Sequence, residues 1–239
     1  RNNGFISAST TSAGDGGNIT LQAPNTLQLD GQGKVSVTTS SSGNAGTIAD
    51  ESEDLTLKNG VEISASTTGS GNAGNITLRG DRLGLDQSQV SAFTAGLGNA
   101  GQILLTGKTT SQAQQITLQN NSQLSTTIQP TGVSDQPSNI RLETEQLTLQ
   151  TQSVISTSTA GIGNAGNITV PNAETITLNN SQMTASTNTE SDAGAINLTA
   201  KQSINLDQNS QLTTETSGGG NARDINLTAP QLVVDNGSR

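Results

Sequence analysis

Short groups of alternating aliphatic and polar residues recur along the whole chain at a spacing of about 28 residues. Residues 63–90 show one complete unit, in which Ile76 and Leu78 form one alternating pair and Leu83 and Leu85 form the next. Alternation with a period of two predicts short β-strands with one buried face. The Gly, Asn, Asp and Ser residues between the groups leave no room for a helix of ordinary length. The sequence therefore predicts three short strands in each unit.

Eight such units follow one another, and the third aliphatic position is 13 residues before the next Ile in every unit but one. A connection of constant length predicts a defined corner. A single unit has too little apolar surface to fold alone, so neighbouring units must stack to form a continuous core. We therefore predict an all-β, single-stranded parallel β-solenoid of about eight coils, with a rise of roughly 4.8 Å per coil and a length on the order of 38 Å.

The repeat runs without a break, which predicts one repeat domain over residues 1–239. The segment from Arg1 to Ser12 begins at a third strand, and the chain stops after a second strand. We expect a fragment of a longer fibre, because open parallel edges invite end-to-end self-association unless they are capped.

Composition narrows the classes of function. The chain has no Cys, His, Trp or Tyr, and its net charge is −9. Without Cys or His the usual zinc ligands are missing, and an acidic chain does not suit nucleic acid or an anionic membrane as a partner. No stretch approaches the roughly 20 apolar residues of a membrane span. We expect no cofactor, no metal and no catalytic residues.

A Gly-Asn-Ala-Gly corner precedes the first strand in four of the eight units, and we expect its glycines and asparagines to adopt positive φ there. Stacking predicts a structural ladder in which each side chain bonds the next coil. Because only two of its members are acidic, we do not expect calcium at this corner. Its members are Asp15, Asn44, Asn72, Asn99, Gln136, Asn164, Asp192 and Asn221.

A second polar column lies in the third strands, one residue after the aliphatic position. A hydroxyl array of this kind predicts an exposed ladder that could contact ice or glycans, although Phe93 and Glu215 interrupt the flanking column. Ser and Thr ladders also simply suit an exposed parallel sheet. The column consists of Ser7, Ser36, Ser64, Ser91, Ser125, Ser156, Thr184 and Thr213.

The second coil places Asp50 where other coils have Leu or Val, and Glu51, Glu53 and Asp54 follow. Burying such carboxylates is costly, so we expect the strand to end early or to bulge outward. Stacking would place Asp54 beside Arg82 and Lys58 between two aspartates, as on a solvated edge. The alternative is a polysaccharide-cleaving site, which needs two carboxylates at a set distance, but the chain offers no Trp or Tyr to stack a sugar.

The fourth coil is the longest, with 37 residues from Ile103 to Ile140. Its extra residues predict long loops at 106–115 and 129–138. The second contains Pro130, Gly132 and Pro137, so we expect it to leave the solenoid.

The repeated Gly-Asn-Ala-Gly-Asn-Ile-Thr-Leu, as at residues 71–78, is followed by Leu-x-Leu and by Ser-x-Ile/Val/Leu-Ser-Ala/Thr. This pattern resembles the filamentous haemagglutinin-type repeats of large bacterial exoproteins, especially those of cyanobacteria. The resemblance covers nearly the whole chain. It implies a right-handed β-helix that is secreted or displayed at the cell surface.

The same resemblance implies export by two-partner secretion through an outer-membrane transporter, and adhesion to cells or glycans. The family's amino-terminal secretion domain, with its Asn-Pro-Asn-Gly-like signature, is not present in this sequence. An Arg79-Gly80-Asp81 triplet is present between two strands. We interpret it as an ordinary polar turn, because a three-residue match is a weak signal.

Overall fold

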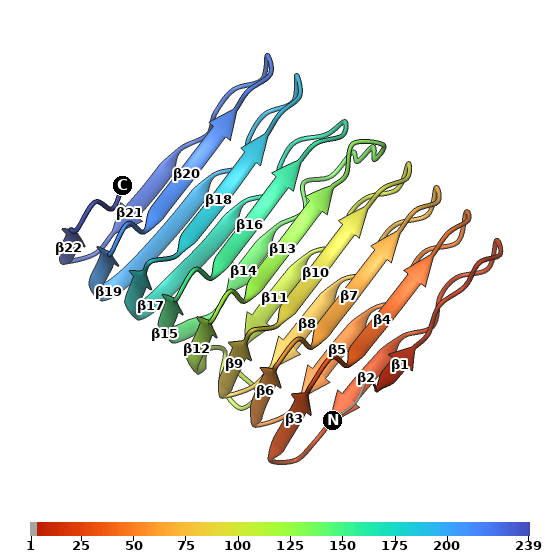
Figure 1. The fold of residues 1–239 in the computed structure, drawn as a ribbon, viewed down its shortest axis with the longest axis horizontal. Coiled ribbons are helices and arrows are strands. Elements are labelled where there is room, and N and C mark those ends of the chain that lie inside the picture. The colour runs from red at the N-terminus through yellow and green to blue at the C-terminus, as the bar shows by residue number, and fades with distance from the viewer. Residues whose placement is uncertain (1–3) are drawn as a thin grey trace.

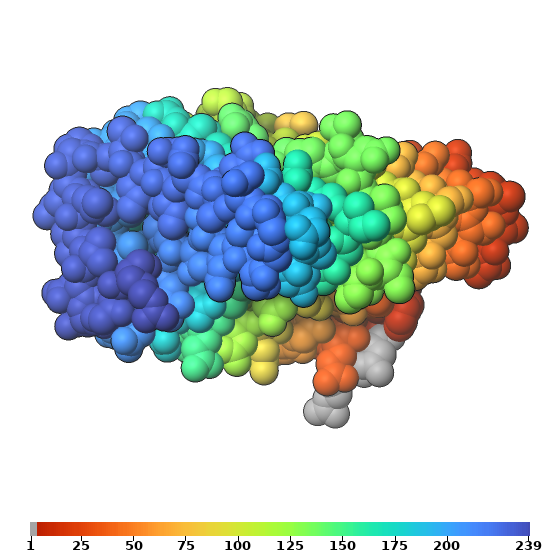
Figure 2. Space-filling model, turned by 90° about the horizontal axis from the view of Figure 1, so that it is seen from above, coloured from red at the N-terminus to blue at the C-terminus, as the bar shows by residue number. Residues whose placement is uncertain are grey.

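The computed structural model describes residues 4–239, so the first three residues of the expected domain lie outside the described residues. Within this range all regular elements are β-strands, and they stack as a parallel β-solenoid of about eight coils (Figure 1). The fold class expected from the sequence is therefore confirmed. Figure 2 shows the same stack in space-filling form, as one continuous body from the N-terminal to the C-terminal coil.

The strands fall into three columns. The first column contains β2 (Ile19–Gln22), β5 (Ile48–Glu51), β8 (Ile76–Arg79), β11 (Ile103–Thr106), β14 (Ile140–Leu142) and β21 (Ile225–Thr228). The second contains β3 (Thr26–Asp30), β6 (Asp54–Lys58), β9 (Arg82–Asp86), β12 (Ala113–Gln119), β15 (Thr144–Gln150) and β22 (Gln231–Val234). Two longer strands, β17 (Ile168–Asn179) and β19 (Ile196–Asp207), run through both columns and join them into one 14-stranded sheet.

The third column forms a separate eight-stranded sheet. It contains β1 (Phe5–Ser7), β4 (Lys34–Thr39), β7 (Glu62–Thr67), β10 (Gln89–Thr94), β13 (Gln123–Ile128), β16 (Val154–Thr159), β18 (Gln182–Thr187) and β20 (Gln211–Thr216).

Every strand pair is parallel and keeps the register that the repeat predicts, so equivalent residues of successive coils lie over one another. Ile48, for example, pairs with Ile19 on one side and Ile76 on the other. Leu55 and Leu57 align in the same way with Leu83 and Leu85. The aliphatic side chains point inward from all three columns and form one core along the rod. A modest apolar content is sufficient because almost every aliphatic position is used.

The corner between the second and third strands and the Gly-Asn-Ala-Gly corner before the first strand need their residue types for different reasons. Between the second and third strands the chain turns through positive φ at Asn59, Gln87, Asn120, Asn180 and Gln208, among others. Among the Gly-Asn-Ala-Gly glycines, in contrast, only Gly163 has a positive φ, of 132°. The prediction that the glycines and asparagines of this corner adopt positive φ is therefore wrong for all of them except Gly163. Glycine is needed at this corner because a Cβ would meet the backbone of the preceding coil. At Gly74, for example, it would meet the carbonyl of Gly46.

The fourth coil keeps its extra residues close to the stack. Strand β11 ends at Thr106 and β12 begins at Ala113, so only residues 107–112 of the first expected loop lie outside the strands. Segment 129–138 does not leave the solenoid, contrary to expectation. The amide of Gln129 donates to the carbonyl of Thr94 at 2.8 Å, and Val133 forms a parallel bridge with Ile162. The neighbouring coils offer unpaired backbone groups at this point, and the inserted residues satisfy them.

Candidate functional site

The serine and threonine column of the third strands lies in continuous register from Ser7 to Thr213. It is not uniformly exposed, as the sequence suggested. Ser36, Ser64 and Ser91 are buried, with 4%, 1% and 8% of their surface accessible. These short side chains lie between the outward side chains two positions before and after them, and the close strand spacing excludes solvent from them.

Two rows of side chains flank this serine column on the outer face of the eight-stranded sheet. One row holds residues two positions earlier in each strand: Lys34, Glu62, Gln89, Gln123, Val154, Gln182 and Gln211. The other holds residues two positions later: Thr38, Ser66, Phe93, Thr127, Ser158, Ser186 and Glu215. We call the hollow between the two rows over β7, β10, β13 and β16 the serine furrow; Ser91, Ser125 and Ser156 lie on its floor.

The serine furrow crosses four successive third strands. A hollow of about 490 Å³ there is lined by Gln89, Phe93, Gln123, Ser125 and Ser156, among others. The Nε2 of Gln89 donates to the Oε1 of Gln123 at 3.1 Å, which links adjacent coils along the wall. The lining therefore combines amides, hydroxyls and one aromatic ring.

The hydrogen bonds of the corner ladder join a side-chain oxygen of one coil to a backbone amide of the next coil. The Oδ1 of Asn44 accepts from the Asn72 amide at 2.9 Å, and the Oδ1 of Asn72 accepts from the Asn99 amide at 2.9 Å. Asp15 accepts from Asn44 at 2.7 Å and Asp192 accepts from Asn221 at 2.9 Å in the same geometry. The ladder therefore satisfies corner N–H groups that no strand partner reaches.

The fourth coil changes this ladder. Asn99 Oδ1 accepts from the amides of Asp135 and Gln136 together, at 2.9 and 3.2 Å. Within residues 4–239 no ladder hydrogen bond joins Gln136 to Asn164, and the pattern resumes from Asn164 to Asp192 at 2.9 Å. The three extra residues of this coil displace Gln136 from the equivalent position.

Sequence inspection missed a second, parallel ladder. It uses the asparagine that directly precedes the first strand of a coil: the Oδ1 of Asn75 accepts from the Gln102 amide at 2.8 Å, and the Oδ1 of Asn139 accepts from the Asn167 amide at 2.8 Å. The recurrence of that asparagine was the available signal. In both ladders the Oδ1 atoms accept from backbone amides of the next coil, so both ladders stabilise the corner.

We expect Asn72→Ala to lower the free energy of unfolding by about 1 kcal/mol, because it leaves the Asn99 amide without its acceptor. Asn72→Asp is the matched control. Asp15 and Asp192 already fill this role in other coils, so the variant should stay close to wild type. Urea denaturation of the two variants measures the difference, and equal destabilisation would contradict the role of the ladder acceptor.

Asp50 points into the core, contrary to the expected early strand end or bulge. Strand β5 continues to Glu51, Asp50 pairs with Leu21 and Leu78, and its side chain is completely buried. The hydroxyl of Ser52 donates to Oδ2 at 2.9 Å, but Oδ1 has no hydrogen-bond partner. Burial raises the pKa of the Asp50 carboxyl to about 6, against the lowering effect of the Ser52 hydrogen bonds and of the nearby Lys108 charge.

The other acids of this coil point elsewhere. Glu51 is exposed and accepts from Gln22 at 2.9 Å, and Asp54 lies 3.4 Å from Arg82 as the stacking predicted. Lys58 aligns between Asp30 and Asp86 in register. Because Asp50 is internal and Glu51 external, these two neighbours do not face one another across a groove, as a pair of hydrolytic carboxylates would.

Residues 107–112 form a strap along the ridge of corners between the first and second strands. Lys108 Nζ donates to the Pro24 carbonyl in the first coil at 2.9 Å, and the Thr109 hydroxyl donates to Asp81 in the third coil at 3.1 Å. In the opposite direction, Gln112 Nε2 donates to the Asn172 carbonyl at 2.7 Å. One six-residue segment therefore contacts corners from the first coil to the sixth.

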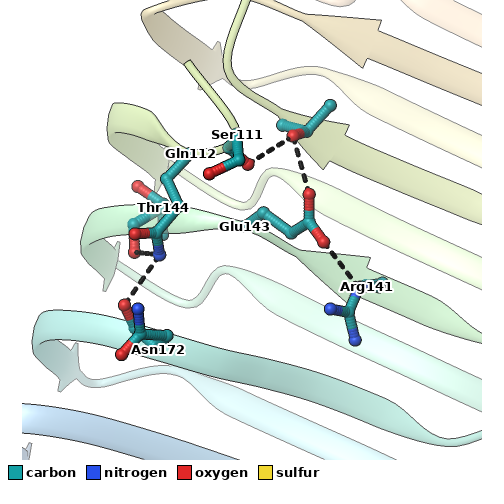
Figure 3. A network of polar contacts seen from close by, with 7 residues as sticks. Ser111, Gln112, Arg141, Glu143, Thr144 and Asn172 are labelled. Carbon is teal, nitrogen blue, oxygen red and sulfur yellow. Dashed lines mark hydrogen bonds and ion pairs between the residues drawn. The ribbon is translucent and has the colours of Figure 1, made fainter.

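Figure 3 shows the C-terminal half of the strap. Gln112 reaches across Thr144 to Asn172, while Glu143 accepts from Arg141 at 2.8 Å and from the Thr106 hydroxyl at 2.8 Å. The Thr106 hydroxyl also donates to the Ser111 carbonyl at 2.9 Å. These contacts fix the end of the strap next to the start of β12.

The strap also covers the Arg79-Gly80-Asp81 triplet. Asp81 is only 7% exposed, and both of its carboxylate oxygens accept from the Thr109 hydroxyl. Gly80 is buried as well. The triplet is therefore a structural turn in this fold, because its carboxylate is not available to a second protein.

We expect Thr109→Val to cost about 2 kcal/mol of folding free energy, since it removes a hydroxyl bonded to a nearly buried carboxylate. Thr56→Val is the control, because Thr56 lies on the outer face of β6, half-buried and away from the strap. Guanidinium denaturation compares the two. If Thr109→Val were as stable as Thr56→Val, the strap would contribute nothing at Asp81.

Over the described range, no group of three or more Asp or Glu side chains is arranged to hold a metal ion. No helix in residues 4–239 is long and apolar enough to cross a membrane. No family model matches this chain, and neither a curated protein nor a solved structure matches it.

Proposed function

We propose that this chain is a structural and adhesive segment of a secreted or cell-surface fibre, of the filamentous haemagglutinin type that its repeats resemble. The observation that carries the proposal is the unbroken in-register stacking of all three strand columns. Such a stack resists bending and shear because each coil is hydrogen-bonded to both neighbours along its length. It keeps its outer faces at a fixed spacing, as a spacer that presents contact surfaces requires.

The same proposal includes export through an outer-membrane transporter and contact with cell surfaces or glycans, as the resemblance implies. The strap supports a mechanical role, since it ties the first coil to the sixth outside the sheets. The ice-binding alternative has less support. The serine column forms the floor of a furrow, and Phe93 interrupts the row beside it, so the face is not a flat hydroxyl array.

Attachment under flow tests this function. Beads carrying the chain through one terminal tag are expected to stay on polysaccharide-coated glass or on cells at shear rates that remove bare beads. Beads carrying the heat-denatured chain are the control. If folded and denatured chains retain beads equally, or neither exceeds bare beads on any surface, the adhesive role is wrong.

A further inference from the structure

The serine furrow has the dimensions of a binding groove for an extended ligand. The 490 Å³ hollow is lined by residues of four successive third strands, from Glu62 on β7 to Ser156 on β16. Four strands at roughly 4.8 Å spacing extend over about 14 Å. A second hollow of about 280 Å³ shares Glu62, Gln89 and Gln123 and continues toward the corner at Gly60 and Asn121. The groove therefore suits a chain of linked units better than one compact molecule.

The hydrogen-bonding capacity of the groove exceeds what the protein uses. Gln89 and Gln123 make one bond to each other, and each amide has further donors and lone pairs. The hydroxyls of Ser125, Ser156 and Thr127 each offer one donor and two lone pairs. Because the strands are in register, these groups repeat at the strand spacing along the furrow. A ligand with regularly spaced hydroxyls matches this arrangement.

The electrostatics of the groove select against charged ligands. Glu62 is the one acidic residue in the lining, and its Oε1 lies 2.6 Å from Lys34 Nζ, so its charge is already compensated. No basic residue is among the lining residues, and the chain carries a net charge of −9. A polyanion would be repelled by the chain as a whole, and a polycation would find no unpaired carboxylate here.

Phe93 supplies the apolar element. It is one of only two Phe residues in a chain without Trp or Tyr, and in its row it lies between Ser66 and Thr127. Its ring lines the hollow beside the amides. An aromatic face together with a few convergent polar groups is the usual composition of a ligand site, and sugar rings present both an apolar face and a rim of hydroxyls.

We propose that the serine furrow binds a linear, uncharged polysaccharide whose chain lies along the rod axis. This inference rests on the proposed adhesive function and specifies its ligand. Phe93 stacks against the apolar face of a sugar ring, Gln89 and Gln123 bond its hydroxyls from one wall, and the serines of the floor bond those that point inward.

The repeat itself provides conservative variants for the test. Phe93→Thr installs the residue that coil four has at this position, and Gln89→Val with Gln123→Val installs the residue that coil five has in that row. Gln211→Val is the matched control, because Gln211 occupies the same row on β20 outside the hollow. Each change reproduces a residue that the sheet already accommodates, and circular dichroism checks that the fold is kept.

Affinity electrophoresis through gels containing hydroxyethylcellulose, xyloglucan, dextran or alginate measures binding. We expect retardation by at least one of the three neutral polymers and none by alginate. Phe93→Thr and the double glutamine variant should weaken that binding at least tenfold, while Gln211→Val should not change it. The inference is overturned if no neutral polymer retards the chain, if alginate is preferred, or if the furrow variants bind as wild type does.

The two proposals fail in different ways. If beads carrying the chain attach under flow but the furrow variants attach equally well, adhesion stands and the furrow is not its site. If wild-type beads do not attach at all while electrophoresis shows furrow-dependent binding, the polysaccharide inference stands and adhesion under load is wrong.

Discussion

Gly74→Ala should lower the free energy of unfolding by about 3 kcal/mol or more, because a Cβ at this position meets a fixed backbone group. A Cβ on Gly74 would point along the stack into the carbonyl of Gly46 in the preceding coil, far inside van der Waals contact. Neither partner can rotate away, since both belong to the hydrogen-bonded corner. The two coils would have to separate locally, which breaks ladder bonds on each side.

Gly84→Ala is the matched control, in the next strand of the same coil. A Cβ at Gly84 would have the Leu55 carbonyl as its nearest neighbour, at 3.8 Å, which is an ordinary contact. The aligned residues in adjacent coils are Thr56 and Thr117, so this column already accommodates side chains. We expect Gly84→Ala to be neutral, or stabilising by up to about 0.5 kcal/mol through reduced chain entropy. Thermal denaturation of both variants measures the difference in stability. If both variants lose similar stability, the close spacing of the coils does not explain the corner glycines.

The strand columns and their register could be predicted from the sequence because both depend on local patterns. The alternation of Ile76 with Leu78 fixes which face is buried, and the constant 13-residue interval fixes the corner. Asp50 shows the limit of local reasoning. Its own polarity predicted an outward position, but slipping the strand by one residue would have turned Ile48 out of the core as well. The aligned neighbours Leu21 and Leu78 set the position instead.

The furrow and the strap could not be predicted because they depend on distances between coils. Ser64 is buried only because of the side chains that surround it on adjacent strands. The strap contact from Lys108 to Pro24 joins residues 84 apart in the sequence, and no periodic signal indicates in which direction an inserted segment will run. The corner glycines were located correctly from the sequence, but their cause is contact with the preceding coil, which a single repeat does not reveal.

Asp50→Leu should stabilise the protein by about 3 kcal/mol at neutral pH, which equals the cost of raising a carboxyl pKa from 3.8 to about 6. Leu is the residue at the aligned positions 21 and 78, so the core has room for it. The change also removes the unpartnered Oδ1. Glu51→Gln is the control: it neutralises the adjacent exposed acid and should leave stability nearly unchanged. If Asp50→Leu is destabilising, the carboxylate has a structural partner that outweighs its burial.

The pH dependence separates the charge of Asp50 from its shape. A carboxyl whose pKa is raised in the folded state favours folding below its ordinary pKa, and that contribution is lost as the pH rises from 3.8 through about 6. The advantage of Asp50→Leu should therefore shrink from about 3 kcal/mol at pH 7.5 to about 1 kcal/mol at pH 4.5.

Asp30, Glu174 and Asp192 have lowered pKa values, through their hydrogen bonds with Asn59, Lys201 and Asn221 respectively. Their stabilising contributions are lost only as the pH falls through those lowered values, so the window between pH 4.5 and 7.5 reports mainly on Asp50. Urea denaturation of wild type and variant across that window measures the difference, and Asp50→Asn should show the same flat profile as Asp50→Leu. An advantage of Asp50→Leu that does not change with pH would show that the pKa of Asp50 is not raised on folding, because a carboxyl with the same pKa in the folded and unfolded states contributes no pH dependence.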